Sequence, residues 1–562
     1  MQLITAEQAR SFDSCLINDL RIPSAALMRR ASAAVAAVCL DKLDELFEGT
    51  GAARLRVLAL CGAGNNGGDG FGTAAEILRQ SVTRGYELET AALAVGDLRR
   101  QTAEAREMAE TFALFGGRTY SAAERTGDAE ELIARADIII DAVFGVGLSR
   151  PVDADAARIF GLVNSSGAFV VACDIPSGVA SDTGKVLGAA IRADVTVTFT
   201  RPKLGCYLSP GAALCGRIIA APIAPEPLAE RFFSGGRTAY VNARPVIARR
   251  ARDSHKGEHG RVSIIAGSVG LSGAAIFAMR AASAAGAGLV YAYVPEGLYG
   301  IVAAAADGEI VAPYAEIDCA RIFERSDAVL VGPGLGLSDG AKNIVAELLR
   351  LSREAENPPP LILDADALTI AAESPDMLCG TKNVVLTPHD GEFARLVNAD
   401  PNNTGYDFPD GRLAAASGFV GKYGVAVVLK GFRTLICAPE ESAAVNTTGS
   451  PAMAKGGSGD VLAGMLAGLS AQARRGGLPL SGEVNAAVYL HGLAGERAAA
   501  ERGEYSVSPL HIIDCISKAI LLCTEDVDDT VSENTGSKAD CGYLRYRGGG
   551  VSFFLPGAGE CK

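Results

Sequence analysis

The sequence predicts two α/β domains in series, each built on a mainly parallel sheet with helices on both faces. Three observations lead to this prediction. Short, continuously apolar runs alternate with segments of helical spacing, a pattern typical of parallel strands buried on both faces. The chain has 562 residues, more than the ~100–200 residues of one domain. The alternation stops near residue 224 and starts again near residue 262.

The expected strands are the apolar runs themselves. In the first half they cover residues 55–60, 88–95, 138–141, 168–173 and 194–199, with a helix expected at 71–79. In the second half they cover residues 262–266, 289–294, 328–331, 361–363, 384–386 and 425–429, with helices expected at 273–285 and 460–469. The two halves do not repeat each other in sequence, so we expect two different domains.

The domain boundary is marked by a change in composition. Residues 222–252 contain four prolines, two adjacent glycines and the basic run Arg249-Arg250-Ala251-Arg252, which together favour a connecting segment. We therefore expect a first domain at 1–225, a linker at 226–249, a second domain at 250–524 and a tail at 525–562. No role is predicted for the tail, in which residues 551–555 suit an edge strand.

Composition narrows the class of protein. The net charge of −13 disfavours nucleic-acid binding. The 13 cysteines form neither a Cys-x-x-Cys pair nor a Cys/His cluster of zinc spacing, which favours a reducing compartment. The start of the chain has no signal-peptide pattern, and the apolar stretches are too short to span a membrane. We therefore expect a cytoplasmic, homo-oligomeric protein that acts on small molecules, with no membrane or nucleic-acid partner.

A glycine-rich run, Cys61-Gly62-Ala63-Gly64-Asn65-Asn66-Gly67-Gly68-Asp69-Gly70, follows the first expected strand and leads into a helix. Its glycines fit G-x-G-x-x-G, where positive φ and close backbone approach let a pyrophosphate bind at a helix N-terminus. That motif alone also fits a tight turn. The added Asn-Asn-Gly-Gly-Asp supplies oxygen acceptors that suit a hard cation or a polyhydroxy ligand.

Two further strand ends carry oxygen ligands. Asp141 ends one apolar run, and Asp174 follows another in Asp174-Ile175-Pro176-Ser177-Gly178. Ligands of open α/β sheets bind beyond the carboxyl ends of the strands. We therefore expect Asn66, Asp141 and Ser177 to converge on one ion, with Asp174 beside it as an acid/base. The alternative is that each Asp only caps a helix or a turn.

Together with Asp141-x-x-x-Gly145-x-Gly147 and Pro202-Lys203-Leu204-Gly205, these motifs resemble the NAD(P)H-hydrate epimerase domain (the YjeF N-terminal family) over about residues 1–225. The resemblance implies a Rossmann-like three-layer fold, a K⁺ ion held by Asn66, Asp141 and Ser177, and interconversion of the R and S epimers of a hydrated nicotinamide nucleotide. By the same match, the hydrate contacts Asn65, Asn66, Gly67, Gly68, Asp69, Gly145, Val146, Gly147, Leu148, Ser149, Arg150, Pro151 and Asp174.

A second glycine-rich run, Gly456-Gly457-Ser458-Gly459-Asp460, joins a loop to an apolar helix. Its amides and the helix N-terminus form an anion hole suited to a phosphate in transfer. Phosphoryl transfer also needs a base for the attacking hydroxyl, and Asp460 is the candidate. The alternative is that Asp460 only caps the helix, although a cap does not require the preceding glycines.

Other strand ends of the second half fit the same site. Lys430-Gly431-Phe432-Arg433-Thr434 follows a strand, so its lysine can reach a nucleotide phosphate. Three more expected strands are followed by polar or glycine-rich segments. These segments are Gly332-Pro333-Gly334-Leu335-Gly336, Asp364-Ala365-Asp366 and Thr387-Pro388-His389-Asp390-Gly391-Glu392. A lone histidine is more often structural, but His389 is one of only 5 and lies beside two acidic residues. We therefore expect His389 to be functional.

Gly-x-Gly-Asp before a helix is similar to ribokinase-like small-molecule kinases. With His259-Gly260-Arg261-Val262 and Gly286-Ala287-Gly288, the full set resembles the ADP-dependent NAD(P)H-hydrate dehydratase domain over about residues 250–522. The resemblance implies a ribokinase-like α/β fold, Mg²⁺ with the nucleotide phosphates, and ADP-driven loss of water from the S hydrate with release of AMP and phosphate. By the same match, the hydrate contacts Ala274, Gly336, His389 and Asp460, and the adenine nucleotide contacts Lys430, Gly431, Phe432, Arg433, Thr434 and Gly459.

The sequence departs from these families at two places. Leu27-Met28-Arg29-Arg30-Ala31-Ser32 stands where the first family has a Leu-Met-Glu-x-Ala-Gly-like helix. Asp390 stands where the second more often has Pro, a change expected to have little consequence.

Three other functions compete with hydrate repair. A kinase of the ribokinase or hydroxymethylpyrimidine type would release a stable phosphorylated product and leave the first-half motifs unexplained. The first domain could instead be a non-catalytic binding module, although Asp174 and the Asn pair are present. The hypothesis of a nicotinamide oxidoreductase is supported by the G-x-G-x-x-G motif alone. The leading hypothesis is a bifunctional isomerase and lyase.

Overall fold

The computed structural model describes residues 1–50, 54–82, 84, 87–122, 126–234, 239–397, 408, 410–478 and 480–524. The chain divides into two compact units, residues 2–239 and the residues from Tyr240 onward together with Met1. The expected linker at 226–249 contains helix α7 (Glu226–Phe233) and strand β9 (Ala239–Val241). Residues 235–238 of that linker, and the expected tail at 525–562 with its edge strand, lie outside the described residues.

The first unit contains a seven-stranded sheet in which every described pairing is parallel. Its strands, in spatial order, are β4 (Arg118–Ser121), β3 (Glu87–Ala94), β2 (Arg54–Cys61), β5 (Ile138–Ala142), β6 (Phe169–Cys173), β7 (Val195–Phe199) and β8 (Arg217–Ala221). The five expected strands are confirmed. The edge strands β4 and β8 are largely exposed or half-buried, so they lack the apolar run that predicts a central strand.

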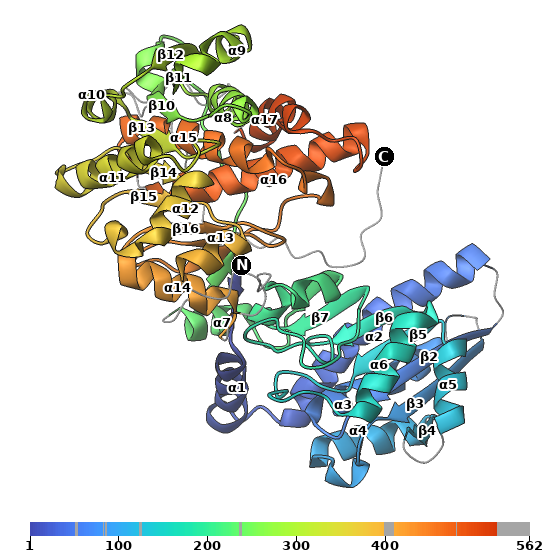
Figure 1. The fold of residues 1–562 in the computed structure, drawn as a ribbon. Helices are drawn as coiled ribbons and strands as arrows, with labels where there is room; N and C mark the ends of the chain where they lie inside the picture. Colours follow the sequence, from blue (N-terminus) through green and yellow to red (C-terminus); the bar gives the residue numbers. More distant parts are fainter. Residues whose placement is uncertain are drawn as a thin grey trace, which may run out of the picture. The chain divides into compact units, whose positions relative to one another are not determined.

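Helices cover both faces of this sheet (Figure 1). Helices α2 (Ser24–Thr50), α3 (Asn65–Ser81) and α4 (Ala103–Leu114) pack together, and α5 (Thr126–Arg135) packs on α6 (Ala154–Ser166). On β2, Val57 and Ala59 belong to the core beneath α2 and α3, whereas Leu58 and Leu60 belong to the core on the α5 and α6 side. The expected three-layer α/β fold is therefore confirmed. The unit also contains β1 (Gln2–Leu3) and α1 (Ala6–Ser14).

The second unit contains a larger mixed sheet. In spatial order its strands include β18 (Ala443–Val445), β17 (Leu435–Cys437), β16 (Ala426–Leu429), β15 (Val384–Leu386), β14 (Leu361–Leu363), β13 (Ala328–Val331), β10 (Arg261–Ile265), β11 (Leu289–Pro295) and β12 (Ile310–Tyr314). Pairing is parallel from β16 to β12 and antiparallel from β16 to β18. The six expected strands are confirmed, and the half-exposed edge strand β12 was not predicted.

The helices of the second unit form two groups, one on each face of the sheet (Figure 1). Helices α8 (Ser272–Ala284), α15 (Ser458–Gly476), α16 (Leu480–Arg502) and α17 (Pro509–Cys523) pack together. The other group is α10 (Cys319–Arg325), α11 (Asp339–Glu354), α12 (Asp366–Glu373) and α13 (Asp390–Leu396), while α9 (Tyr299–Ala304) and α14 (Gly411–Tyr423) complete the unit. Helices α8 and α15 approach closely because Gly464 lies against the carbonyl of Ala278. Among the described helices, none is long and apolar enough to cross a membrane.

Candidate functional site

The first candidate site lies where the strand order of the first sheet reverses. Strands β2 and β5 are neighbours there, and their connections leave in opposite directions along the sheet. Helix α3 begins at Asn65 directly after β2, with Gly64 as its N-cap. Asp141 lies on β5 and Asp174 directly follows β6. The predicted site residues therefore converge at the ligand-binding edge of a doubly wound sheet.

Asp141 and Ser177 form a buried pair. The Ser177 hydroxyl donates to Asp141 Oδ1 at 2.5 Å, and the Ser177 amide donates to Asp141 Oδ2 at 2.7 Å. Both side chains are fully buried. Burial raises the pKa of Asp141 to about 6 although these hydrogen bonds oppose the shift. A buried carboxylate of this kind is stabilised in its ionised form by a nearby cation.

Asn66 reaches the same place through the loop after β5. A Cβ atom at Gly145 would lie 3.3 Å from Asn66 Oδ1, and the Phe144 amide donates to Ser177 Oγ at 2.8 Å. The Asn66 Nδ2 atom is buried and has no hydrogen-bond partner among the described residues. The loop residues Gly147, Ser149, Arg150 and Pro151 are exposed. The structure thus brings together the three predicted ion ligands and leaves the predicted hydrate-binding loop open.

Asp174 forms an ion pair that motif reasoning did not assign. Its backbone has φ +67°, and the Lys203 ammonium donates to its carboxylate. Thr198 Oγ1 also donates to Asp174 Oδ1, at 3.2 Å. Lys203 is only 3% exposed, so the pair lies in a desolvated part of the site. Burial and the carboxylates of Asp174 and Asp13 raise the pKa of half-buried Asp69 well above its usual range.

Gly62 and Gly67 of the G-x-G-x-x-G run serve close packing and not backbone handedness, whereas a Cβ atom at Gly64 would meet nothing within 4 Å. None of Gly62, Gly64 and Gly67 has a positive φ, which corrects that part of the prediction. A side chain at Gly62 would clash with the Val143 carbonyl, and one at Gly67 would clash with the Gly62 carbonyl. The glycines therefore let α3 begin six residues earlier than the expected helix at 71–79 and lie directly against β2 and β5.

The second candidate site surrounds the N-terminus of α15. Gly457 is its N-cap with φ +98°, so the Gly-Gly pair makes the turn into the helix. Asp460 is the third helical residue, and the helix has no side-chain cap. The capping alternative for Asp460 is therefore wrong. Burial and the carboxylate of Asp364 raise the pKa of Asp460 to about 7, while Lys430 opposes the shift.

Lys430 lies among carboxylates beside this helix end. Its ammonium donates to Asp364 Oδ1 at 2.8 Å and lies 3.8 Å from Glu392 Oε2. A Cβ atom at Gly459 would lie 3.3 Å from the same nitrogen. Burial opposes the charged form, but Asp364 and Glu392 outweigh it and raise the pKa of Lys430. The predicted nucleotide residues Lys430 and Gly459 are thus neighbours.

The rest of the predicted nucleotide segment is a tight, partly exposed turn. Gly431 has φ +152° and Arg433 has φ +62°. The Arg433 guanidinium donates to the Thr447 carbonyl at 3.2 Å, and Thr434 Oγ1 donates to the Gly431 carbonyl at 3.1 Å. The Phe432 ring is 53% exposed. The Arg433 guanidinium lies 5.1 Å from the centroid of that ring, so an aromatic ring and a cation stand together in the predicted nucleotide segment.

The residues predicted to contact the hydrate lie in loops that follow strands of the second sheet, near the start of α15. His389 caps α13, because its Nδ1 accepts from the amides of Gly391 at 3.1 Å and Glu392 at 3.3 Å. The Gly336 amide donates to Asp366 Oδ2 at 2.8 Å, and Asp366 is one of the carboxylates that raise the pKa of Asp460. Ala274 is close to the same loop, since a Cβ atom at Gly334 would lie 3.1 Å from Ala274 Cβ.

Comparison with known proteins decides the family. Residues 24–205 match the family described as YjeF-related protein N-terminus, and residues 262–518 match NAD(P)H-hydrate dehydratase. The bifunctional NAD(P)H-hydrate repair enzyme of Moorella thermoacetica is 34% identical, covering 95% of this chain and 100% of its own. The corresponding protein of Thermofilum pendens is 34% identical over 85% of this chain and 89% of its own.

The chain belongs to the family of bifunctional NAD(P)H-hydrate repair enzymes. Among solved structures, the ADP/ATP-dependent NAD(P)H-hydrate dehydratase of Bacillus subtilis is 27% identical, covers 50% of this chain and 95% of its own, and has a TM-score of 0.43.

One departure from the repair-enzyme motifs is compensated within the first unit. Ser32, which replaces the usual Gly, donates to the Asp69 carbonyl at 3.2 Å. It fits because Gly72 faces it on α3, where any Cβ atom would clash with Ser32 Oγ. Arg29 pairs with Glu107 at 3.0 Å, and Arg30 donates to the Ile223 carbonyl at 3.0 Å.

That Asp390 has little consequence stays a prediction, but the structure gives this residue a buried partner. Asp390 accepts from Nε of Arg412 at 2.9 Å, and the Arg412 side chain is 2% exposed. The same guanidinium donates to the Lys430 carbonyl at 3.1 Å. Asp390 therefore fixes an arginine that holds the predicted nucleotide segment, a role that proline could not fill.

His491 is a further polar group that sequence reasoning missed. It lies on α16, is 8% exposed, and contacts the backbone of Ser458 at the start of α15. Burial lowers the pKa of His491 to about 4, so its ring is neutral near pH 7. His491 Nε2 and Ser458 Oγ both lack partners among the described residues. No local pattern marks His491, because an isolated histidine in an apolar helix resembles a core residue.

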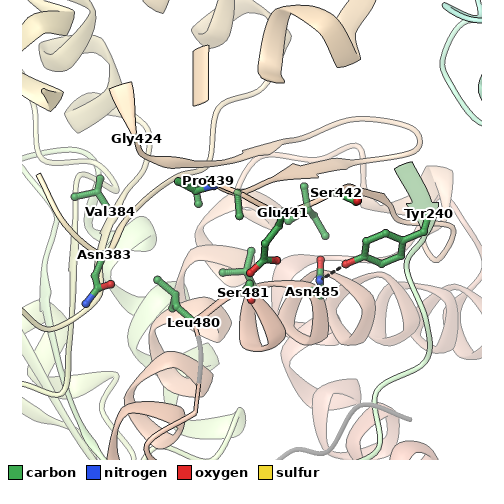
Figure 2. A pocket seen from close by; sticks show the side chains of 14 residues that line it. Tyr240, Asn383, Val384, Gly424, Pro439, Glu441, Ser442, Leu480, Ser481 and Asn485 are labelled. Carbon is green, nitrogen blue, oxygen red and sulfur yellow. Dashed lines mark hydrogen bonds between the residues drawn. The ribbon is translucent and has the colours of Figure 1, made fainter. Parts of the chain in front are cut away.

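A separate cavity of about 290 Å³ lies in the second unit, away from the carboxyl ends of the strands (Figure 2). Asn383 and Gly424 on its wall precede β15 and β16, so it opens at the amino-terminal ends of these strands. Asn485 donates to Tyr240 Oη at 2.9 Å on its other wall. None of the predicted site residues lines it, so it is distinct from the second candidate site.

Proposed function

We propose that the chain repairs hydrated NADH and NADPH in two steps. The first domain interconverts the R and S hydrates, and the second dehydrates the S hydrate with ADP, releasing AMP and phosphate. The observation that carries the proposal is Asp460, a carboxylate with a pKa of about 7 in the first turn of the α15 anion hole. A carboxylate whose pKa burial raises toward neutrality is suited to accept a hydroxyl proton.

The second-domain reaction makes a poor leaving group into a good one. The hydrate hydroxyl attacks the β-phosphorus of ADP, Asp460 takes the hydroxyl proton, and AMP leaves. The carbon–oxygen bond of the phosphate ester formed in this way then breaks, driven by the lone pair of the ring nitrogen, and phosphate leaves. Loss of a proton and of the nitrogen's positive charge restores the dihydronicotinamide. The amides at the start of α15 stabilise the charge that develops on the transferred group.

The ligand contacts follow the motifs. We propose that Ala274, Gly336, His389 and Asp460 bind the hydrate, and that Lys430, Gly431, Phe432, Arg433, Thr434 and Gly459 bind the adenine nucleotide. Supporting this, Lys430 and Gly459 are adjacent, and Gly336 is joined to Asp366 beside Asp460. Among the described residues, no group of three His, Cys, Asp or Glu side chains is placed to hold a metal. Mg²⁺ would therefore be bound chiefly through the nucleotide phosphates.

In the first domain, Asp174 is the proposed acid/base and Lys203 its partner. The proposed hydrate contacts are Asn65, Asn66, Gly67, Gly68, Asp69, Gly145, Val146, Gly147, Leu148, Ser149, Arg150, Pro151 and Asp174. Asn65 is already oriented, because it accepts from Thr102 Oγ1 at 2.7 Å. A buried acid held by an ammonium and a hydroxyl is suited to move a proton at the hydrated ring carbon without help from bulk water.

The proposed K⁺ site consists of Asn66, Asp141 and Ser177. The residues fit a monovalent cation, because all three offer oxygen ligands and Asp141 is a buried carboxylate. Bound K⁺ would balance the Asp141 charge and fix the loop that carries Gly145. Replacing K⁺ by tetramethylammonium, which is too large for such a site, should slow epimerisation without slowing dehydration of the S hydrate.

A cytoplasmic location and a homo-oligomeric state stay predictions. The first is supported by the free thiols of all eleven cysteines among the described residues. Sedimentation of the purified protein would measure the second.

Product analysis separates hydrate repair from kinase activity. With S-NADH hydrate, ADP and Mg²⁺, repair predicts one AMP and one phosphate for each NADH formed. A kinase of the ribokinase type would instead leave a stable phosphorylated product and no NADH. Detection of that product by mass spectrometry would contradict the proposed function.

A further inference from the structure

A cavity of about 720 Å³ opens beside the dehydratase site. Its wall includes Ser268 after β10, Pro295 at the end of β11, Tyr314 at the end of β12 and Leu335 after β13. All four strands are parallel, so the cavity lies at their carboxyl ends. The strand order of the second sheet reverses between β10 and β13, which is where open α/β sheets bind ligands.

The cavity is continuous with the proposed hydrate contacts. Leu335 and Ser338, which flank Gly336 in sequence, both line it. A Cβ atom at Gly336 would lie 3.7 Å from the hydroxyl of Ser268, another lining residue. The Gly336 amide in turn donates to Asp366 at 2.8 Å, close to Asp460. A dinucleotide whose hydrated ring lies at Asp460 and Gly336 therefore has this cavity beside it for its other end.

The volume of this cavity and the residues that line it suit a nucleoside. The volume lies within the ~300–1,000 Å³ of small-ligand pockets. Leu335 and Ile344 give it a buried apolar wall, and Tyr314 adds an aromatic ring whose pKa is raised by burial. Val269, which is 88% exposed, stands at its rim. Exposed and half-buried apolar side chains of this kind can pack against the faces of a purine ring.

The charged residues of the lining are all acidic. Glu316, Asp318 and Glu347 line the cavity, and among the described residues no Lys, Arg or His does. Glu347 is compensated by Arg350, which donates to both of its oxygens, at 2.7 and 2.8 Å. Asp318 is held as the N-cap of α10 by the Arg321 amide at 3.0 Å, and Glu316 is exposed. Glu316 and Asp318 are therefore the two charges left to act on a ligand.

We propose that this cavity binds the adenosine end of the hydrated dinucleotide and makes the dehydratase prefer NADH hydrate over NADPH hydrate. The inference rests on the proposed function. The two substrates differ by one 2′-phosphate, which carries about −1.5 to −2 charges near pH 7. Glu316 and Asp318 repel that group, and no cation in the described lining binds it. The unphosphorylated ribose meets no such repulsion.

The test compares the kcat/KM values for S-NADH hydrate and S-NADPH hydrate at saturating ADP. We expect the wild type to favour NADH hydrate about tenfold, chiefly through KM, and the ratio to fall as salt screens the charges. In Glu316→Gln/Asp318→Asn the ratio should approach unity through a gain on NADPH hydrate. Asn is as good an N-cap as Asp, so α10 keeps its cap.

A matched control removes the same two charges outside the cavity. Glu324→Gln/Glu356→Gln alters α10 and the segment after α11 at positions that do not line it, and should leave the ratio unchanged. Equal kcat/KM values in the wild type, or a ratio that the cavity variant does not reduce, would overturn the preference. If neither hydrate is repaired by any of the proteins, the proposed function itself fails, and the substrate preference falls with it.

Discussion

The ammonium of Lys430 donates to the carboxylate of Asp364 at 2.8 Å, in a part of the second unit that also holds Glu392 and Asp460. One cation thus serves several carboxylates. Asp364 is 1% exposed and accepts the direct hydrogen bond from Lys430. Asp460 interacts with Lys430 only through the longer-range attraction of opposite charges. Burial and the carboxylate of Asp364 therefore raise the pKa of Asp460 to about 7 although a lysine lies nearby, which is the pKa expected of the proposed base.

The pH dependence of dehydration follows from Asp460. Asp460 is proposed to act as a base in its ionised form, so kcat/KM should rise with pH and level off above an apparent pKa of about 7. Lys430 lowers this pKa, so Lys430→Met should move the rising limb to higher pH, whatever it does to the maximal rate. The measurement is a pH–rate profile with S-NADH hydrate. An unshifted limb in Lys430→Met would show that Lys430 does not tune the base.

Asp174 and Lys203 should affect only epimerisation. We expect Asp174→Asn to slow it by at least ~10²-fold, the usual contribution of a general acid or base. Lys203→Met should also slow it, because the acid loses its ion-pair partner. The readout is NMR of R-hydrate conversion, with dehydration of S hydrate as the internal control. Parallel loss of both activities would indicate misfolding and not an epimerase role.

Gly72 should be indispensable only while Ser32 is present. A Cβ atom at Gly72 clashes with Ser32 Oγ, so Gly72→Ala should lower the free energy of unfolding by about 1–3 kcal/mol. Adding Ser32→Gly should recover most of this loss. Denaturant unfolding of the two single variants and the double variant measures the coupling. Additive effects would contradict a direct contact between the two positions.

Glu483 should destabilise the second unit at alkaline pH. It is 2% exposed, its Oε2 has no partner among the described residues, and burial raises its pKa from 4.5 to about 8. The folded state thus binds the proton more tightly, so wild-type stability falls as pH rises from 4.5 to 8. Glu483→Gln should match the wild type near pH 4.5 and exceed it by ~4 kcal/mol at pH 9. A pH-independent difference between the two proteins would contradict this pKa.

The central strands and the loops that follow them could be predicted because they are encoded locally. Residues 138–140 and 328–331 are continuously apolar, and the structure buries them completely. Edge strands such as β4 and β12 bury too little surface to leave that signal. The start of α3 was placed too late because Gly67 and Gly70 suggest a loop. Only the carbonyl and side chain packed against them reveal why glycine occupies these helical positions.

The candidate site was predictable where a residue belongs to a motif, and not where its role depends on a distant partner. Asn66, Asp141 and Ser177 were chosen from strand ends, and the structure joins them through one loop. By contrast, the pairing of Lys203 with Asp174, 29 residues away, was not predicted although Lys203 belongs to a quoted motif, and neither was the contact of His491 with Ser458 on another helix. Spacing along the chain carries no signal for such contacts, because they depend on how helices and strands pack.

The central claim is that both hydrate epimers are repaired by one chain. The most direct measurement is the recovery of dihydronicotinamide absorbance from an equilibrated mixture of R and S hydrates of NADH, with ADP, Mg²⁺ and K⁺. We predict recovery to completion by the wild type, recovery of the S fraction alone on the same timescale by Asp174→Asn, and none by Asp460→Ala. No recovery by the wild type, or full recovery by Asp460→Ala, would contradict the claim.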